Sequence, residues 1–306
     1  MLYDVIKGKL SYSFPGKLLC VINLVLLQIA CISAPIDKRI HFRTLCENGN
    51  LPEIKKLISS QEKRAINECL YDASSFPEII KFLITAGADV SSINYNFNSK
   101  TPLMHLITKD AKYVLSNNDY KSMKILVAAG ANVNVHDNSG ISALMWAAKE
   151  VKPEAVKLLL SAGAEINGKD KTNNTALAYA SLAERYVPYY RKEHYETIKL
   201  LLAADADVNI KNRIGQTVLM SAANNYNLKI TKMFLSAGAD VNVVDQLGMT
   251  ALIFSARGDD ANPEVVKLLI KSGAKINHRD GYGKTALGRA TNKKVKKILI
   301  KAGAKK

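Results

Sequence analysis

Motifs that carry enzyme chemistry are missing from this sequence of 306 residues. Its four cysteines and five histidines follow no metal-ligand spacing, so no zinc site is predicted. A glycine-rich phosphate loop and a Gly-x-Ser-x-Gly nucleophile motif are also absent. Some aspartates recur at one position of a repeated pattern, and a recurring residue cannot mark a single active site. They are Asp137, Asp170, Asp245 and Asp280. We therefore expect a protein that is not an enzyme, with no cofactor and no small-molecule substrate.

A long apolar run is lacking too. Leu18 to Ala34 are 17 uncharged residues interrupted by Asn23 and Gln28, whereas a spanning helix needs about 20 predominantly apolar residues. A stable membrane span is therefore the less favoured interpretation. Three lysines precede the run, which is the order of an export signal. They are Lys7, Lys9 and Lys17.

The end of this run is compatible with more than one kind of export signal. Pro35 directly after Ala34 does not resemble a good signal-peptidase site. The residues before Cys31 resemble a bacterial lipoprotein signal, in which the cysteine becomes lipidated, although Gln28 departs from that pattern. We expect residues 1–34 to be such a leader and the protein to be exported as a membrane-anchored lipoprotein. The alternatives are a soluble periplasmic or secreted protein, and an uncleaved anchored chain or a cytoplasmic one.

Only two cysteines, Cys46 and Cys69, lie beyond the leader. Small thiols in neighbouring helices are usually core residues, and free cysteine is among the most buried residue types. An oxidising compartment would allow a disulfide, but the sequence cannot supply the geometry that a disulfide demands. We predict that Cys46 and Cys69 are unpaired core residues.

One motif recurs through the chain: Thr or Ser, then a small residue or Pro, then Leu. Its copies begin at Thr101, Ser142, Thr175, Thr217, Thr250 and Thr285, at spacings of 41, 33, 42, 33 and 35 residues. A second marker keeps the same period, an apolar segment that ends in Ala-Gly-Ala or a close variant. Its centres are Gly87, Gly130, Gly163, Asp205, Gly238, Gly273 and Gly303. Two markers in register predict an array of stacked units.

Each marker has a structural role in a unit of two helices. The Thr or Ser can cap the first helix by accepting a backbone hydrogen bond, and Pro102 is tolerated in the first turn. The second helix has a buried apolar stripe with lysines on its outward side. The glycine after it can adopt the left-handed conformation that ends the helix. An Asn-x-x-Asp-x-x-Gly segment, such as Asn134 to Gly140, then favours a tight turn.

These markers resemble the ankyrin repeat, with its 33-residue period and Thr-Pro-Leu-His signature. The resemblance implies an all-α solenoid of helix-turn-helix units with short β-turn or hairpin connections. Within a domain of residues 35–306, degenerate units cover about 41–93 and clear units about 94–306, which makes about eight in all. The family's His after the Leu is replaced here, so we expect more apolar packing between these helices. The replacements are Met104, Met145, Ala178, Met220, Ile253 and Gly288.

The two longer spacings place insertions between the helices of two units, at about 109–121 and 184–194. Both insertions contain aromatic and basic residues, and insertions in repeat arrays collect on one face, often a binding face. Tyr189 and Tyr190 are therefore candidate partner contacts. Alternatively, the insertions lengthen helices that pack their tyrosines against each other.

The resemblance also implies a partner-binding surface, because ankyrin proteins usually contact partners with their turn tips and first helices. Apolar tip residues are Ile214, Leu247 and Tyr282. Four residues after each motif Thr or Ser lies a column about 200° around the helix from the buried Leu. This column consists of His105, Trp146, Tyr179, Ser221, Phe254 and Arg289. We expect its aromatic members and His105 to contact a partner. Alternatively, the adjacent unit half covers the column.

We therefore expect a non-catalytic scaffold that binds a protein partner of unknown identity. The net charge of +16 suggests an alternative function. The segment from Arg279 to Lys306 has ten Lys or Arg residues and a single acidic residue, Asp280, so it contributes +9 of this charge. A terminal unit must face water on one side, and lysines achieve this. The alternative function is adhesion of this basic end to an anionic membrane; nucleic acid is the less favoured polyanion.

Overall fold

The computed structural model describes residues 38–94, 98–109, 115–183 and 191–305. Within these ranges the backbone forms α-helices, one 3-10 turn and connecting turns, with no strand beyond isolated bridges. The prediction of an all-α fold is confirmed. No helix in this part of the chain is both long and apolar enough to cross a membrane. The predicted leader, including Cys31, lies outside the described residues.

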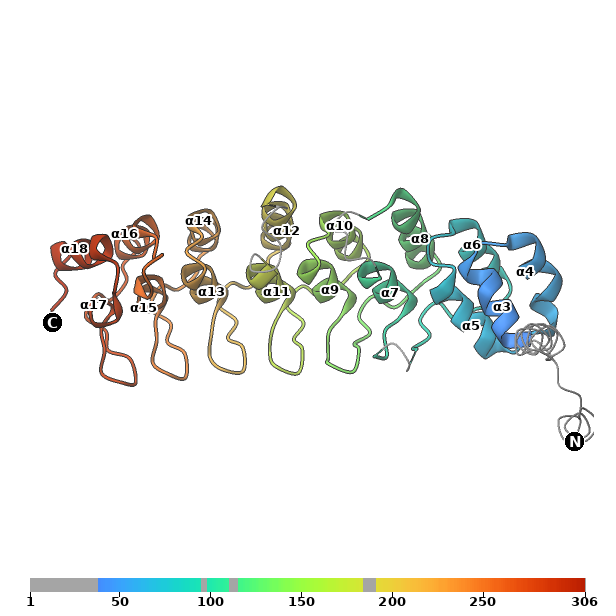
Figure 1. Ribbon diagram of the computed structural model, residues 1–306, viewed down its shortest axis with the longest axis horizontal. Coiled ribbons are helices and arrows are strands. Elements are labelled where there is room, and N and C mark those ends of the chain that lie inside the picture. Colours follow the sequence, from blue (N-terminus) through green and yellow to red (C-terminus); the bar gives the residue numbers. More distant parts are fainter. Residues whose placement is uncertain (1–37, 95–97, 110–114, 184–190, 306) are drawn as a thin grey trace, which may run out of the picture.

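Two layers of helices run along the stack (Figure 1). The first helix of each pair, here called an inner helix, lies in the layer from which the long turns project. The inner helices are α7 (Pro102–Thr108), α9 (Ala143–Lys149), α11 (Ala176–Leu182), α13 (Val218–Asn224), α15 (Ala251–Ala256) and α17 (Ala286–Arg289). The second helix of each pair, the outer helix, packs on the opposite side. The outer helices are α8 (Asn117–Ala128), α10 (Pro153–Ser161), α12 (Arg191–Ala203), α14 (Leu228–Ser236), α16 (Pro263–Lys271) and α18 (Lys293–Lys301).

Four N-terminal helices form two further pairs without the long turns. They are α3 (Lys38–Glu47), α4 (Leu51–Leu57), α5 (Lys63–Asp72) and α6 (Pro77–Thr85). The first pair is joined to the second by the short 3-10 turn η1 (Ile58–Ser60), and α3 packs directly against α5. The predicted solenoid of paired helices is therefore confirmed, with an irregular start.

The inner helices begin where the motif predicted. Ser142 and Thr250 accept hydrogen bonds from the backbone N–H three residues later, both at 3.3 Å. The corresponding bonds are made by Thr101, Thr175 and Thr285. Thr217 is the exception, because its side chain makes no capping bond to α13. The capping prediction is thus confirmed at five of the six motif copies.

The Asn of the turn segment joins neighbouring units, a role that turn propensity did not predict. Nδ2 of Asn242 donates to the carbonyl of Gly273 (3.1 Å), and its Oδ1 accepts from the backbone N–H of Lys275 (2.9 Å). Gly273 ends the next outer helix with a φ of 88°, a left-handed conformation that glycine adopts without strain. The equivalent pairs of bonds are made by Asn134, Asn209 and Asn277.

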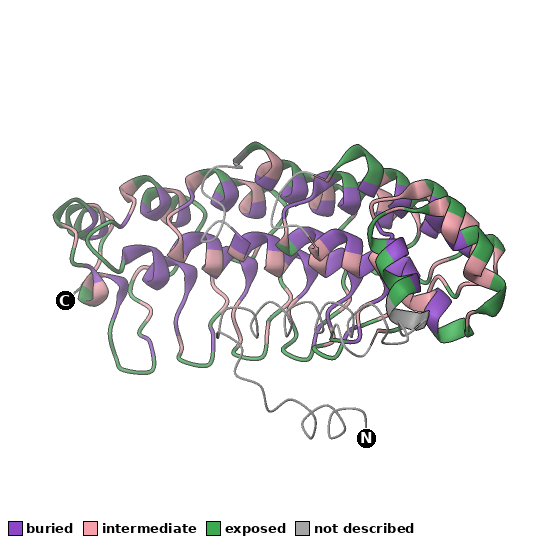
Figure 2. Ribbon diagram, turned by 45° about the vertical axis from the view of Figure 1, so that its right-hand side comes forward, coloured by how far each residue is buried: buried purple, intermediate pink, exposed green. Residues whose placement is uncertain are grey.

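The core runs continuously along the stack between the two helix layers. Figure 2 shows buried residues following the inner helices from one end to the other. The residues that replace the family's His are largely part of this core: Met104, Met145, Met220 and Ile253 are 1–2% exposed. The expectation that apolar packing takes over at these positions is therefore confirmed there. Burying one such side chain stabilises the folded state by roughly 1.5–3 kcal/mol relative to leaving it exposed to water.

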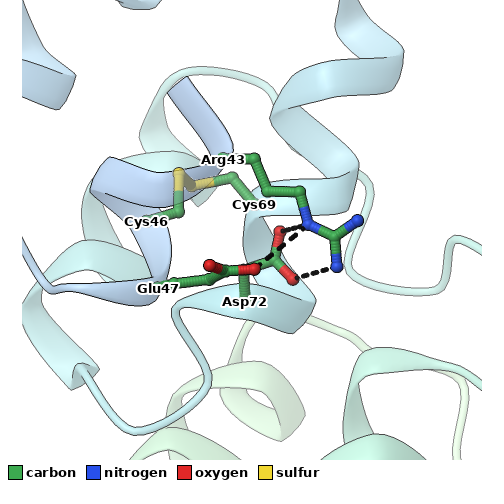
Figure 3. The surroundings of a disulfide bond; sticks show 5 residues. All are labelled: Arg43, Cys46, Glu47, Cys69 and Asp72. Atoms are coloured by element: carbon green, nitrogen blue, oxygen red, sulfur yellow. Dashed lines mark hydrogen bonds and ion pairs between the residues drawn. A yellow bond between two sulfur atoms is a disulfide. The ribbon is translucent and has the colours of Figure 1, made fainter. Parts of the chain in front are cut away.

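Cys46 and Cys69 form a disulfide between α3 and α5, with Cα atoms 5.5 Å apart (Figure 3). The prediction that they are unpaired is wrong, although both side chains are buried as expected. The two helices pack side by side, which brings together residues that are 23 positions apart in the sequence. This juxtaposition depends on how two degenerate units stack, and cysteine spacing alone does not reveal it.

An ionic cluster lies beside the disulfide (Figure 3). Nε of Arg43 is 3.0 Å from Oδ2 of Asp72 and 3.3 Å from Oε1 of Glu47. Burial raises the pKa of Asp72 to about 6, and this effect outweighs the lowering by Arg43. The carboxylates of Glu47 and Glu68 raise it further. Asp72 is therefore an acid that takes up a proton more readily in the folded state than in the unfolded chain.

The C-terminal end of the stack differs from its interior at matched positions. Val266 of α16 is fully buried against the next unit, whereas the corresponding residue of α18, Lys296, is exposed. Likewise, the buried Ile253 of α15 corresponds to the exposed Gly288 of α17. The last unit thus presents lysine and glycine where inner units present apolar side chains, which suits a terminal unit in water.

Candidate partner-binding surface

From the turn before α9 onward, each long turn is organised by one carboxylate or amide oxygen. In the turn before α9, Oδ1 of Asp137 accepts hydrogen bonds from the backbone N–H of Ser139 (2.8 Å) and of Ile141 (3.0 Å). The same pair of bonds is accepted in the following turns by Asp170, Asn212, Asp245 and Asp280. The recurrence of these residues therefore reflects turn structure, as predicted, and Asn212 serves equally well.

The second oxygen of three of these carboxylates is bonded to the column residue nine positions later. The pairs are Trp146 Nε1 to Asp137 (3.0 Å), Tyr179 OH to Asp170 (2.6 Å) and Arg289 Nε to Asp280 (2.7 Å). Each bond fastens a turn to the inner helix of its own unit. The column residues thus have a structural role besides any contact with a partner.

These contacts change the acidity of the groups involved. Burial by itself raises the pKa of Asp170, but hydrogen bonds from Tyr179 and from the turn backbone lower it below its ordinary value. The pKa of Asp280 is lowered in the same way, by the turn backbone and by Arg289, against the effect of burial. Burial and the bond to Asp170 raise the pKa of Tyr179, so its hydroxyl stays protonated.

None of the column residues is fully exposed. His105, Trp146, Tyr179, Ser221 and Arg289 are half-buried. Phe254 is only 7% exposed and offers a partner almost no surface. The column is therefore largely covered by its own and the adjacent units, and its largest partly accessible aromatic side chains are Trp146 and Tyr179.

Two lysines flank these aromatic rings. Lys100 Nζ lies 4.0 Å and Lys149 Nζ 4.5 Å from the centroid of the Trp146 ring, and Lys149 is also 5.7 Å from the Tyr179 ring. Burial lowers the pKa of Lys100. Lys149 is exposed, so it places a positive charge at the accessible edge of both rings.

His105 lies at the N-terminal end of the column. Its ring meets the ring of Tyr71 edge-on, with centroids 5.8 Å apart. Burial, together with the charges of Lys109 and Lys100, lowers the pKa of His105 to about 4. The imidazole is therefore neutral near pH 7, and this end of the column is aromatic rather than charged.

A ladder of backbone hydrogen bonds joins the tips of successive turns. Gln246 N–H donates to the Ile214 carbonyl (3.1 Å), and Gly281 N–H donates to the Leu247 carbonyl (2.8 Å). In the preceding turns, backbone N–H groups donate in the same way to carbonyls of the turn before: Asn138 to Asn98, Lys171 to Ser139 and Arg213 to Thr172. The approach at the tips is close: a Cβ added to Gly248 would lie 2.9 Å from the backbone nitrogen of Gly281. The tips therefore form one fixed row.

The apolar tip residues project from this row into solvent. Ile214 is 51%, Leu247 50% and Tyr282 68% exposed, among the largest exposed fractions of any large apolar side chain in the described residues. They come from three successive turns that the ladder holds together. The structure thus brings together the tip residues that the sequence singled out, and it separates them from the buried Phe254.

The insertions lengthen two outer helices. α8 has 12 residues and α12 has 13, whereas α10, α14, α16 and α18 have nine each. At the base of the first insertion, Lys109 Nζ lies 2.5 Å from Oδ1 of the buried Asp119. Tyr189 and Tyr190 lie outside the described residues.

The two larger surface grooves lie away from this row, whereas a small cavity of ≈ 30 Å³ lies between the turns before α11 and α13, beside Ser221. A groove of ≈ 480 Å³ beside α5 is lined in part by Asn67, Tyr71 and Ser92, and one of ≈ 560 Å³ lies between α12 and α14. Neither includes a tip or column residue. In the described part of the chain, no group of three or more His, Cys, Asp or Glu could hold a metal ion. The exposed tip residues therefore form a row that lies outside both larger grooves.

Two groups of residues that shape this surface were missed from the sequence. The bonds between turn acids and column residues span nine positions, and this constant separation was available as a signal. The lysines beside Trp146 come from different units, Lys100 and Lys149, so their convergence depends on stacking. No local pattern predicts it.

Comparison with known families gives one result. A family model for ankyrin repeats (three copies) matches residues 111–212, 189–280 and 219–306. These overlapping matches cover the units from the first insertion to the end of the chain. No curated protein matches the chain.

Proposed function

The chain belongs to the ankyrin-repeat family, and on that premise we propose that it is a non-catalytic scaffold that binds another protein through the row of turn tips and the adjoining inner helices. The family generally serves as a protein-binding scaffold. The surface we propose comprises Ile214, Leu247 and Tyr282 at the tips. Trp146, Tyr179 and His105 adjoin it on the inner helices, whereas Phe254 is too buried to contribute.

One observation carries this proposal: three large apolar side chains are exposed at successive tips that hydrogen bonds hold in one row. Exposed apolar groups that lie together commonly mark an interaction site. Tyrosine is also among the residues enriched at the energetic centres of interfaces. A backbone that is already ordered loses little further conformational entropy when a partner binds.

The test is crosslinking to the partner in extracts of the native cells. A photoreactive residue at position 214, 247 or 282 is expected to crosslink one and the same protein. Ile300 supplies the control, since it is 57% exposed but lies on α18, away from the tips. A photoreactive residue at 300 should not crosslink that protein, and a triple serine variant of the tips should not capture it. Crosslinks that are equal at all four positions would contradict the proposal.

The N-terminal helix pairs are best explained as degenerate units of the same repeat, which brings the number of units to about eight. α6 starts with Pro77, as α10 starts with Pro153 and α16 with Pro263. It ends before Gly87, whose φ of 88° matches that of Gly273. A fragment that lacks residues up to 94 is expected to leave α7 with an exposed apolar side and to be less soluble than the full chain.

We also propose that the protein is exported, with residues 1–34 as its leader and Cys31 as the lipidation site. The disulfide between Cys46 and Cys69 supports this, because such bonds persist mainly in oxidising compartments. Intact mass of the protein from native cells is the test. A lipid-modified N-terminus at Cys31 is the expected result, a chain that starts near Pro35 would indicate a soluble exported form, and an unmodified chain in the cytosol would contradict export.

A further inference from the structure

We propose that the partner segment that docks on the turn tips is acidic: an extended stretch of protein with carboxylates between apolar side chains. This inference rests on the proposed function, because it describes the partner of the same surface. Three features support it: the burial of the turn carboxylates, the charges that remain exposed, and the apolar residues that lie among them.

Five successive turns contain four carboxylates, all of them buried. These turns are residues 136–141, 169–174, 211–216, 244–249 and 279–284. Their acidic residues are Asp137, Asp170, Asp245 and Asp280, which are 4–7% exposed. Each of them accepts two backbone N–H bonds in its own turn. The turn structure therefore removes every negative side chain from the surface of the row.

The Lys and Arg side chains of the same five turns remain at the surface. They are Lys169, Lys171, Lys211, Arg213, Arg279 and Lys284, all exposed. Among the described residues, no ion pair joins any of them to a carboxylate. Lys171 and Arg279 donate instead to backbone carbonyls, both at 2.7 Å. On the outer helices, by contrast, Lys267 pairs with Glu264. The positive charge of the tips is thus uncompensated within this part of the chain.

Exposed apolar and basic side chains occur together in two of the five turns, 211–216 and 279–284, and Leu247 lies in the turn between them. Ile214 directly follows Arg213, and Tyr282 has the guanidinium of Arg289 5.2 Å from its ring centroid. Within the hairpins that carry these turns, exposed carboxylates such as Glu165 and Asp240 lie where the hairpin leaves the outer helix, before the tip in sequence. A partner that covers the tips therefore meets cations and apolar groups together.

An acidic protein segment can contact both the basic and the apolar side chains of the row, whereas other polyanions match only the basic ones. Nucleic acid would neutralise the cations through its phosphates, but it would leave the aliphatic side chains of Ile214 and Leu247 without apolar contacts. An anionic membrane is attracted by the total basic charge, so it would use the lysines of α18 and of the outer helices as readily as the tips. The presence of basic and apolar side chains in neighbouring turns favours a protein.

The experiment measures binding of a fluorescent synthetic peptide of repeated Glu-Glu-Leu to the full chain by anisotropy. A peptide of repeated Gln-Gln-Leu, a single-stranded DNA oligonucleotide and vesicles containing phosphatidylglycerol are the comparison probes. The tip variant carries Lys169→Gln, Lys171→Gln, Lys211→Gln and Arg213→Gln. The matched control removes the same charge from the outer helices, with Lys124→Gln, Lys157→Gln, Lys199→Gln and Lys232→Gln. Circular dichroism checks that both variants remain folded.

We expect the Glu-Glu-Leu peptide to bind more tightly than its Gln counterpart. The tip variant should weaken this binding roughly tenfold, since each exposed ion pair is worth about a factor of two, while the outer-helix control should change it less than about twofold. Ile214→Ser with Leu247→Ser should weaken peptide binding but not oligonucleotide binding. Equal loss in the two charge variants, or tighter binding of DNA or vesicles than of peptide, would overturn the inference. A crosslinked partner whose contact segment is not acidic would do so too, while leaving the scaffold function intact.

Discussion

The N-terminal helices α3 to α6 and the units from α7 onward bury comparable cores but are held together differently. From the turn before α9 on, each unit repeats the same polar contacts: a carboxylate or amide oxygen that accepts two backbone bonds in the turn, an Asn that bonds to the next unit and a turn tip that bonds to its neighbour. The first two pairs lack the long turn between them and therefore lack these contacts. A disulfide joins them instead. A covalent link thus stands where the regular repeat uses hydrogen bonds.

Tyr71 marks the junction between the two regions. Its hydroxyl lies 2.7 Å from the Ser92 carbonyl and 2.9 Å from the Lys100 carbonyl, which belong to the first long turn. Its ring meets His105 of α7. The junction therefore uses contacts that differ from the repeated pattern, among them those of Tyr71 and the bond from Lys109 to Ser74.

The largest effect is expected from removal of the disulfide. Cys46→Ser with Cys69→Ser frees two residues 23 positions apart, and a crosslink of this kind contributes about 3 kcal/mol. Because repeat units stabilise mainly their neighbours, amide hydrogen exchange should become fast in α3 and α4 and stay slow in α13 to α16. Reductant should have the same effect on the unaltered chain. Loss of protection along the whole stack would contradict this local role.

A turn carboxylate should have the next largest effect, in the regular region. Asp245→Ala leaves the N–H groups of Leu247 and Met249 without their acceptor, at a cost of about 2 kcal/mol. Asp245→Asn is the control, because Asn212 makes the same two bonds in the preceding turn. Thermal unfolding should show a lower midpoint for the alanine variant and only a small change for the asparagine variant. Equal losses would mean that the negative charge, not the acceptor geometry, is what matters.

Helix capping offers a matched pair within the regular region. Thr250 caps α15, whereas Thr217 makes no capping bond to α13 and its buried hydroxyl has no partner among the described residues. Thr250→Val is therefore expected to cost about 1 kcal/mol, and Thr217→Val to be neutral or slightly stabilising. Urea unfolding of the two variants measures the difference. Similar losses at both positions would contradict a stabilising role for the capping bond of Thr250.

The smallest effect is a difference in pH response between the two regions. The pKa values of Asp170 and Asp280 are lowered, so their contribution to stability is present above about pH 4 and is lost as the pH falls further. The pKa of Asp72 is raised to about 6, so its contribution is present below about pH 4 and is lost as the pH rises through about 6.

Asp72→Asn tests this response while leaving other groups unchanged. His105, with its pKa lowered to about 4, destabilises the fold as the pH falls below about 6.5, but it does so equally in both proteins. The variant should therefore gain stability relative to the unaltered chain as the pH rises from about 5 to 7. The measurement is hydrogen exchange of α3 and α5 at both pH values. A constant difference would show that Asp72 does not titrate in this range.

Much of the fold followed from local patterns. The Thr and Ser caps, the glycines that end outer helices and the aspartates of the turns act within about four residues of themselves, so their spacing reveals their roles. The exposed tip residues could be identified for the same reason, since a tight turn places them in solvent. The burial of Phe254 could not, because it depends on which neighbouring side chains cover it.

The sequence by itself determined the repeat, its period, the all-α class and the positions of the turns. Only the tertiary structure decided how the units meet: that Cys46 faces Cys69, that Lys100 of one unit lies over the Trp146 ring of the next, and that the turn tips bond to one another in a row. The physical reason is that contacts between units join residues more than 20 positions apart. Their geometry is set by the packing of side chains from several helices, which no local spacing specifies.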